Sequence, residues 1–290
     1  MATQDLVRAT LVAAGCSVVE EGSIDGVTID QKRLIDQHYY AIASKATILK
    51  PEQLNVPADK FKEQFGLEWE EALKNGNVYN AMDGCAKLDI TPDELDTQWG
   101  ICKKAKKLVK FGGGFYCGLI EIEGKDPVYI FNGFFMSMRN KFTAPGLSIY
   151  YYVVEWEAAS LSWEDFRDKV LGPTDPAEAP ADSLRGMVLS DWEKLGLKEV
   201  PNTGDNAVHA SASPFEAMAE RCNWLKVPVT EDPFAQAMLG YGCQQKWIVD
   251  GMVDPQVPLG DGKKGSLFDA VEALDTDACL AKLGELAQAQ

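Results

Sequence analysis

The chain is short of histidine, of basic residues and of long hydrophobic runs. It contains 2 histidines among 290 residues, and 28 basic against 44 acidic side chains give a formal net charge of −16. Such an excess of acid argues against a surface for nucleic acid or for an anionic membrane. No run of about 18 apolar residues is present, so we expect neither a membrane-spanning helix nor a secretory signal.

The 7 cysteines are scattered and include no Cys-x-x-Cys pair. This distribution indicates reduced thiols in a cytoplasmic compartment and argues against a zinc site. The apolar fraction of 46% is ample for a packed core, and the length allows one large domain or two small ones.

Helical and alternating hydrophobic patterns both occur along the chain, which predicts an α/β protein. The predicted strands are 16–20, 128–131 and 148–156. The predicted helices are 4–15, 29–42, 57–65, 67–75, 92–108, 134–142, 163–170, 190–196, 214–225, 266–274 and 277–288.

One histidine, His209, lies among small residues directly before a predicted helix. Ser213 is a typical cap, a proline follows it, and Glu216 would complete a Ser-x-x-Glu capping box. Free N–H groups and the helix dipole favour an anion at such a place. Imidazole suits nucleophilic or acid–base chemistry near neutral pH, although residue types alone also allow a buried, hydrogen-bonded histidine.

The residues around His209 resemble the active-site signature of the nucleoside diphosphate kinase family, Asn-x-x-His-(small)-Ser-x-Ser followed by a helix. Residues 206–213 read Asn-Ala-Val-His-Ala-Ser-Ala-Ser. Upstream, Gly-Pro-Thr-Asp-Pro-Ala at 172–177 and Ser-Leu-Arg-Gly at 183–186 resemble two further motifs of that family in the same chain order. Several spaced matches make the resemblance specific.

This resemblance implies phosphotransfer from a nucleoside triphosphate to a nucleoside diphosphate through a phosphohistidine. His209 would be the nucleophile, and Glu220 would accept the other ring N–H and orient the imidazole. A Mg²⁺ ion would bridge the phosphates without a protein ligand set of its own. The remaining nucleotide contacts implied by the resemblance are Thr174 and Arg185 on the phosphates, Asn206 on sugar or phosphate, Tyr39 and Ser211 near the transferred group, Tyr116 stacking on the base, and Ile120 lining the base slot.

The resemblance also implies a fold, namely a ferredoxin-like antiparallel sheet of four strands covered by helices. The family-like domain would span 1–250, interrupted by insertions at about 46–110 and 121–147. Residues 251–290 would form a C-terminal helical extension.

Two departures from the family pattern count against activity. The family opens with a strand ending in Lys-Pro, whereas the only Lys-Pro here is Lys50-Pro51, after the helix of Tyr39. The family places a phosphate-binding arginine six residues before the threonine, and here that position is Asp168. Either that first strand precedes the given sequence, or this lineage has lost it. If it is lost, residues 46–50, residues 128–131 or a partner strand are candidates for its place, and we expect a rearranged or partner-completed sheet.

Two functional interpretations therefore stay open. The first is an active nucleoside diphosphate kinase that binds nucleoside di- and triphosphates. The second is a catalytically degenerate, kinase-like scaffold or nucleotide-binding protein of a larger assembly, such as a cytoskeletal one. Either could be a homo-oligomer. The second histidine, His38, is expected to be a surface or packing residue of its helix.

Overall fold

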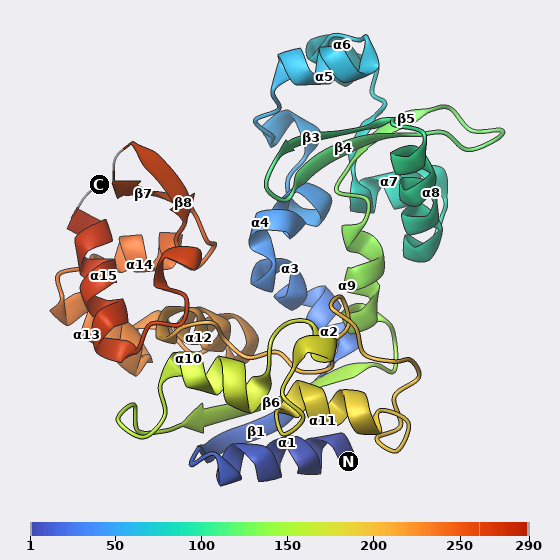
Figure 1. Ribbon diagram of the computed structural model, residues 1–290. Helices are drawn as coiled ribbons and strands as arrows, with labels where there is room; N and C mark the ends of the chain where they lie inside the picture. The colour runs from blue at the N-terminus through green and yellow to red at the C-terminus, as the bar shows by residue number, and fades with distance from the viewer. Residues whose placement is uncertain (1, 261, 289–290) are drawn as a thin grey trace. The chain divides into compact units, whose positions relative to one another are not determined.

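The computed structural model describes residues 2–260 and 262–288 and shows a mixed α/β protein, 51% helix and 16% strand (Figure 1). The predicted α/β class is confirmed. The chain divides into two compact units. We call Met1–Ser23 with Tyr150–Gln290 the discontinuous unit, and Ile24–Ile149 the inserted unit. This division differs from the expected one, because residues 251–290 belong to the unit that contains His209, and 24–45 belong to the other.

The discontinuous unit begins with helix α1 (Ala2–Ala13) and strand β1 (Ser17–Asp25), which runs on into the inserted unit. Strand β6 (Ser148–Glu155) brings the chain back and pairs with β1. The later elements are α10 (Trp163–Asp165), a π-helical segment (Phe166–Leu171), α11 (Leu184–Asp191), α12 (Pro214–Glu220), a second π-helical segment (Arg221–Leu225), α13 (Pro233–Gly240), α14 (Gln245–Gly251), β7 (Gln256–Gly260), β8 (Lys263–Ser266) and α15 (Thr276–Gln288).

Two hydrophobic cores hold this unit together. In the first, Val7 and Leu11 of α1 meet Phe166, Val170 and Leu184. The helical spacing of the α1 residues explains why one face of that helix is buried. This core lies beneath the segment that contains His209, because Val208 and Ala210 pack against it.

The second core joins α12 to the end of the chain. Phe215 and Met218 of α12 pack with Val257 of β7 and with Leu280 and Leu283 of α15. β7 and α15 are therefore structural partners of the helix that follows His209. The helix predicted at 266–274 is wrong: β7 and β8 form an antiparallel hairpin, followed by a short 3₁₀ turn at Asp269–Val271.

The inserted unit contains a four-stranded sheet in the order β2-β5-β4-β3, formed by Val78–Asn80, Val128–Phe131, Phe115–Ile120 and Leu108–Gly112. β2 and β5 are parallel, and the other pairs are antiparallel. The helices of this unit are α2 (Gly26–Gln31), α3 (Leu34–His38), α4 (Tyr40–Ala43), α5 (Ala58–Phe65), α6 (Trp69–Lys74), α7 (Ala81–Leu88), α8 (Pro92–Lys104) and α9 (Phe135–Thr143), with a π-helical segment at Ser44–Ile48.

Strand β5 shows why this sheet is covered on both faces. Val128 and Ile130 pack into a core with α7 and α8, whereas Tyr129 and Phe131 pack into a second core with α5 and α6. Alternate residues of a strand point to opposite faces, so an uninterrupted apolar strand needs a core on each side. Figure 1 shows α5 and α6 on one side of this sheet and α7 and α8 on the other.

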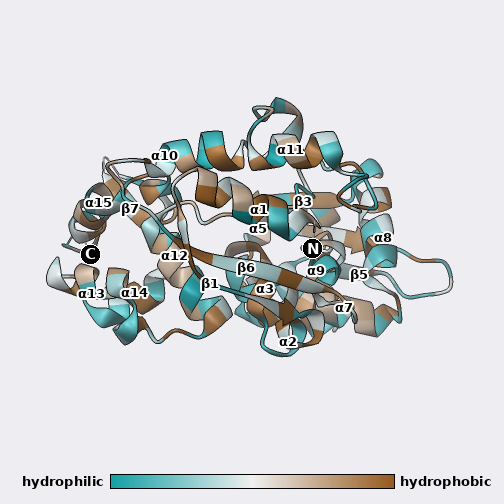
Figure 2. Cartoon of the chain, turned by 90° about the horizontal axis from the view of Figure 1, so that it is seen from below, coloured by the Kyte–Doolittle hydropathy of each residue, from teal (hydrophilic) through white to brown (hydrophobic). Residues whose placement is uncertain are grey.

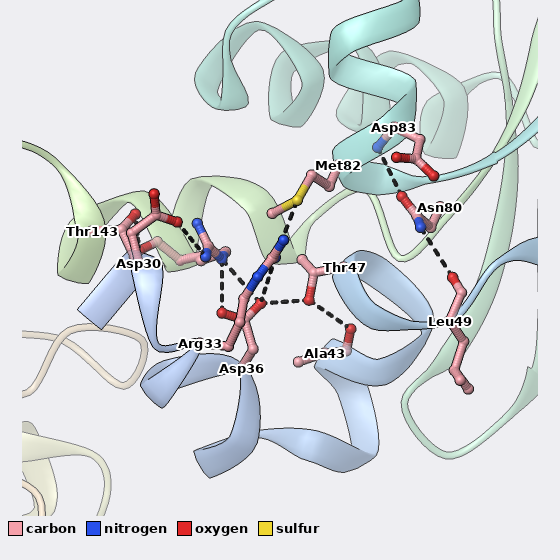
Figure 3. Close-up of polar contacts among 11 residues, drawn as sticks. Asp30, Arg33, Asp36, Ala43, Thr47, Leu49, Asn80, Met82, Asp83 and Thr143 are labelled. Carbon is pink, nitrogen blue, oxygen red and sulfur yellow. Dashed lines mark hydrogen bonds and ion pairs between the residues drawn. The ribbon is translucent and has the colours of Figure 1, made fainter. Parts of the chain in front are cut away.

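The helix predicted at 29–42 is broken into three short helices around a buried ion pair. Arg33 takes a left-handed conformation (φ 55°) between α2 and α3. Asp36 is fully buried, and both of its carboxylate oxygens accept from Nε of Arg139 at 3.0 Å. The Thr47 hydroxyl also donates to Asp36, and Nη2 of Arg139 donates to Asp30 at 2.6 Å (Figure 3). Arg139 is thus a structural charge that ties α9 to α2 and α3.

Neither internal candidate for the lost strand pairs with β1 or β6 among the described residues. Residues 46–50 lie mostly in the π-helical segment, and Lys50 forms an ion pair with Asp83 at 2.5 Å. The 128–131 strand is β5, between β2 and β4. Figure 2 shows hydrophilic and hydrophobic stretches along both β1 and β6. The discontinuous unit therefore has a two-stranded sheet at this place, not a four-stranded one.

Of the remaining predicted elements, some are present at the predicted positions and others are displaced. Strand 128–131 is confirmed, and the helices predicted at 57–65, 67–75 and 277–288 are present within two residues of their predicted ends. The helix expected at 190–196 is misplaced, because α11 begins at Leu184, where Ser183 caps it. Within the described residues, no helix combines the length and apolar character needed to cross a bilayer.

Candidate functional site

The residues around His209 alternate between the core and the surface. Val208 and Ala210 pack against the first core, whereas the His209 side chain is 50% exposed. Just before it, Ala207 takes a left-handed conformation (φ 67°), and Asn206 donates to the Thr174 carbonyl at 3.1 Å. The fold therefore presents His209 at the surface between two anchored neighbours.

Arg185 holds two loops of this site together. It lies in the first turn of α11 and is 8% exposed. Its Nε and Nη2 donate to the Val208 carbonyl at 3.2 and 2.9 Å, and its Nη1 donates to the Gly172 carbonyl at 2.8 Å. The N–H groups of Arg185 therefore donate to backbone carbonyls, whereas the resemblance implies that they bind phosphate. In the structure, Arg185 supports the segment that presents His209.

Two glycines of the predicted motifs are required by close packing. A Cβ on Gly186 would lie 2.0 Å from the Pro180 carbonyl oxygen, so α11 can approach this loop only with glycine there. Gly172 has a left-handed φ of 91°, and its Cβ would lie 2.6 Å from Oγ of Ser183. Both motifs therefore contain positions where only glycine fits.

Glu220 links the histidine to a serine. Nε2 of His209 lies 2.6 Å from Oε1 of Glu220, and Ser211 Oγ donates to the other carboxylate oxygen. The contact implied by the resemblance is therefore present. The Ser211 hydroxyl donates to Glu220 and not to His209, so the three residues do not have the serine–histidine–acid order of hydrolases. Trp163 fixes the segment further, because its indole N–H donates to the Ser211 carbonyl at 3.1 Å.

The start of α12 places a second acid beside this group. Ser213 Oγ accepts from the Glu216 amide at 3.2 Å, which confirms the predicted cap. The predicted capping box is wrong in one detail, since the Glu216 carboxylate accepts from the amide of Ala212 instead of that of Ser213. Reaching one residue further back brings Glu216 toward His209. The helix predicted at 214–225 is present over its whole length, as α-helix to Glu220 and as π-helix from Arg221 to Leu225.

The electrostatics of the cluster follow from two acids near one imidazole. Desolvation lowers the pKa of His209, but the charge and hydrogen bond of Glu220 and the charge of Glu216 outweigh it and raise that pKa above its ordinary value. Burial and the charge of Glu220 raise the pKa of Glu216 to about 7. Near neutral pH, the cluster therefore holds protons that can be exchanged.

A cation that the sequence did not identify lies beside these acids. Arg167 is 26% exposed at its side chain, and its positive charge lowers the pKa of Glu216. Its Nη1 lies 2.5 Å from Oε1 of Glu272. Asp168, where the family pattern would place an arginine, is exposed. Both residues lie in the π-helical segment Phe166–Leu171, whose wider turn shifts the side-chain directions that six-residue counting assumes.

Three residues with predicted nucleotide contacts belong to the inserted unit. Tyr39 lies between α3 and α4 and packs, half-buried, against the core of α7 and α8. Tyr116 packs edge-on against Phe134, with centroids 5.9 Å apart. Ile120 is 1% exposed within the same core, so it is a core residue and does not line an open slot. His38 ends α3 and packs edge-on against Tyr39.

Thus the structure brings His209, Ser211 and Glu220 into direct contact, and it joins Asn206 to Thr174 within the same unit. Among residues 2–260 and 262–288, neither unit taken alone gathers three histidine, cysteine or acidic side chains within metal-ligand reach of one another. Comparison with protein-family models, with curated protein sequences and with solved structures finds no match for this chain.

Proposed function

We propose that the chain is a nucleoside diphosphate kinase-like phosphotransferase that works through a phosphohistidine at His209. The observation that carries the proposal is the 2.6 Å contact between Nε2 of His209 and Glu220, on an exposed segment directly before a helix. An imidazole whose second nitrogen is held by a carboxylate has a fixed orientation and a defined tautomer.

In the proposed reaction, Nε2–H of His209 donates to Glu220, and Nδ1 attacks the γ-phosphorus of a nucleoside triphosphate. The bond from phosphorus to the β–γ bridging oxygen breaks, and the nucleoside diphosphate leaves with that electron pair. A second diphosphate then attacks the phosphohistidine and regenerates the imidazole. Such transfer depends mainly on alignment and on neutralising the spread negative charge. Mg²⁺, bound through the phosphates, would supply part of that charge.

Other residues of the discontinuous unit have supporting roles in this proposal. Ser211 and Glu216 hold the Glu220 carboxylate and the loop amide, and Asn206 with Thr174 forms the edge of the phosphate site. The paired strands β1 and β6, with α1 and α11 packed nearby, would be the remaining part of a ferredoxin-like sheet. A second copy or an assembly partner would complete that sheet.

A second function is favoured by how the cations are used. Arg185 donates to backbone carbonyls, and Arg167 is paired with Glu272. A kinase-like scaffold that binds nucleotide weakly or not at all would be consistent with this arrangement.

Labelling with γ-³²P-ATP and Mg²⁺ distinguishes the two functions. We expect acid-labile, alkali-stable label on His209, lost in His209→Gln. Because the chain has two histidines, His38→Gln completes the assignment. Absence of label at any pH between 6 and 9, or label on another residue, would leave the scaffold as the better interpretation.

The pH dependence gives a second check. Because the pKa of His209 is raised, the neutral ring and hence the labelling rate should increase with pH above the ordinary histidine range. Glu220→Gln removes the charge that raises this pKa, so the rising limb should move to lower pH while the maximal rate falls. An unchanged pH profile in Glu220→Gln would contradict the assigned role of Glu220.

A further inference from the structure

A short C-terminal segment, Glu272–Asp275, lies against the His209 region at three points. The Ala273 amide, in a left-handed conformation (φ 58°), donates to the Ala212 carbonyl at 2.9 Å. The Trp163 amide donates to Oδ1 of Asp275 at 2.7 Å. The third point is the ion pair between Glu272 and Arg167. We call Glu272–Asp275 the latch segment. It places a carboxylate on Arg167 from 105 positions further along the chain.

The charges of the site make that carboxylate significant. A bound triphosphate needs cationic donors, because charge-assisted contacts from guanidinium groups give most of the binding to phosphate. Arg185 is 8% exposed and donates to two carbonyls, so Arg167 is the more accessible guanidinium beside Glu216. Glu272 therefore forms its ion pair with Arg167, the guanidinium group that an anionic ligand can reach more easily.

The pair between Arg167 and Glu272 is suited to being displaced. The Glu272 side chain is 48% exposed, so its carboxylate can turn into water without a desolvation cost. The contact uses Nη1 of Arg167, whereas the buried Nε has no hydrogen-bond partner among the described residues. A phosphate group offers three oxygens and can take two guanidinium donors at once, whereas Glu272 takes one, from Nη1.

We propose that Glu272 of the latch segment is a built-in competitor for the anionic ligand at Arg167, so that the C-terminal segment lowers phosphate affinity until its carboxylate is displaced. The inference rests on the proposed function only in taking a polyphosphate as the ligand; it needs no phosphotransfer. Ligand binding then exchanges one carboxylate for a phosphate on the same guanidinium.

The test is calorimetric binding of MgATP and of inorganic tripolyphosphate to the full chain and four variants. Glu272→Gln should tighten both by about two- to fivefold, the range expected for a partly exposed ion pair. Glu285→Gln is the matched control, because it removes the same charge from an exposed position in α15 of the same unit. It should leave affinity unchanged. Arg167→Gln should weaken binding, and adding Glu272→Gln to it should give no further gain.

The double variant separates competition from a general effect of charge. An equal gain from Glu272→Gln in the Arg167→Gln background would overturn the proposal, as would unchanged or weaker binding in Glu272→Gln alone. Absence of measurable binding in all variants would also overturn it. If Glu272→Gln tightens binding but no protein labels His209, the latch stands and phosphotransfer fails. If the wild type labels His209 while Glu272→Gln binds unchanged, phosphotransfer stands and the latch fails.

Discussion

The two units bury acidic side chains in opposite ways. In the inserted unit, Asp36 is fully buried, and its oxygens are matched by donors from Arg139 and Thr47. In the discontinuous unit, Glu216 and Glu220 lie close enough for the charge of one to raise the pKa of the other. A buried carboxylate whose donors are all in place stabilises a single side-chain arrangement. Two carboxylates beside an imidazole share protons, so several protonation states have similar free energies near neutral pH. The first cluster therefore supports the fold, and the second has the proton exchange that the reaction proposed for His209 would use.

The largest expected effect concerns the buried Asp36–Arg139 pair of the inserted unit. Among the described residues, Arg139→Met would leave the buried Asp36 carboxylate with only the longer ionic contact to Arg33, at 3.9 Å, which should cost about 3–5 kcal/mol of unfolding free energy. Amide hydrogen exchange in β4 and β5 measures this loss within the inserted unit. Asp36→Asn in the Arg139→Met background should recover part of it. A loss below about 1 kcal/mol would show that the pair is not a structural support.

An intermediate effect concerns Glu216. Its pKa is raised to about 7 by burial and by Glu220, so the folded state holds a proton that the unfolded state releases above the ordinary glutamate pKa. Stability contributed by this site therefore falls as pH rises from the ordinary value through about 7. Glu216→Gln should be more stable than wild type by about 1–3 kcal/mol at pH 8 and nearly equal at low pH.

Urea titrations at several pH values measure this difference. Glu285→Gln serves again as the control, because Glu285 is an exposed residue of the same unit. An advantage of Glu216→Gln that does not change with pH would show that Glu216 and Glu220 do not share protons as described.

The smallest expected effect is on folding when His209 is removed. The side chain is 50% exposed, so His209→Ala should change the unfolding free energy by less than about 1 kcal/mol. Because its pKa is raised, any stability from the charged ring is present at low pH and is lost as pH rises through the folded pKa. Thermal unfolding at pH 5 and pH 9 checks this. A large loss at both pH values would make His209 a structural residue.

Local patterns predicted part of this molecule well. The apolar run Val128–Phe131 and the Ser213 cap depend on neighbours in sequence, and both are present. The spacing of eleven residues between His209 and Glu220 came from a resemblance, and the predicted contact exists. What failed depends on distant partners or on uncommon helices. A hydrophobic pattern does not reveal a π-helical turn such as Phe166–Leu171, so it does not distinguish Arg167 from the neighbouring Asp168.

Long-range pairing accounts for the remaining differences. Glu272 and Arg167 are separated by 105 positions, and neither residue has a sequence signal for the other. The hairpin of β7 and β8 is rich in glycine, proline and lysine, which local preferences assign to a loop. Val257 of β7 packs in the second core, against partners that local preferences do not reveal.

The paired strands that connect the two units have a consequence for how the protein could be rebuilt. The Gly26 amide donates to the Leu147 carbonyl at 2.8 Å, so the chain enters and leaves the inserted unit at adjacent points. In topological terms, β1 and β6 are the two strands of a hairpin, and the inserted unit occupies the position of its turn. Excising that unit and joining the strands with a short Asn-Gly turn would restore an ordinary hairpin. The same junction is the place at which to insert a foreign domain, because its two ends lie side by side.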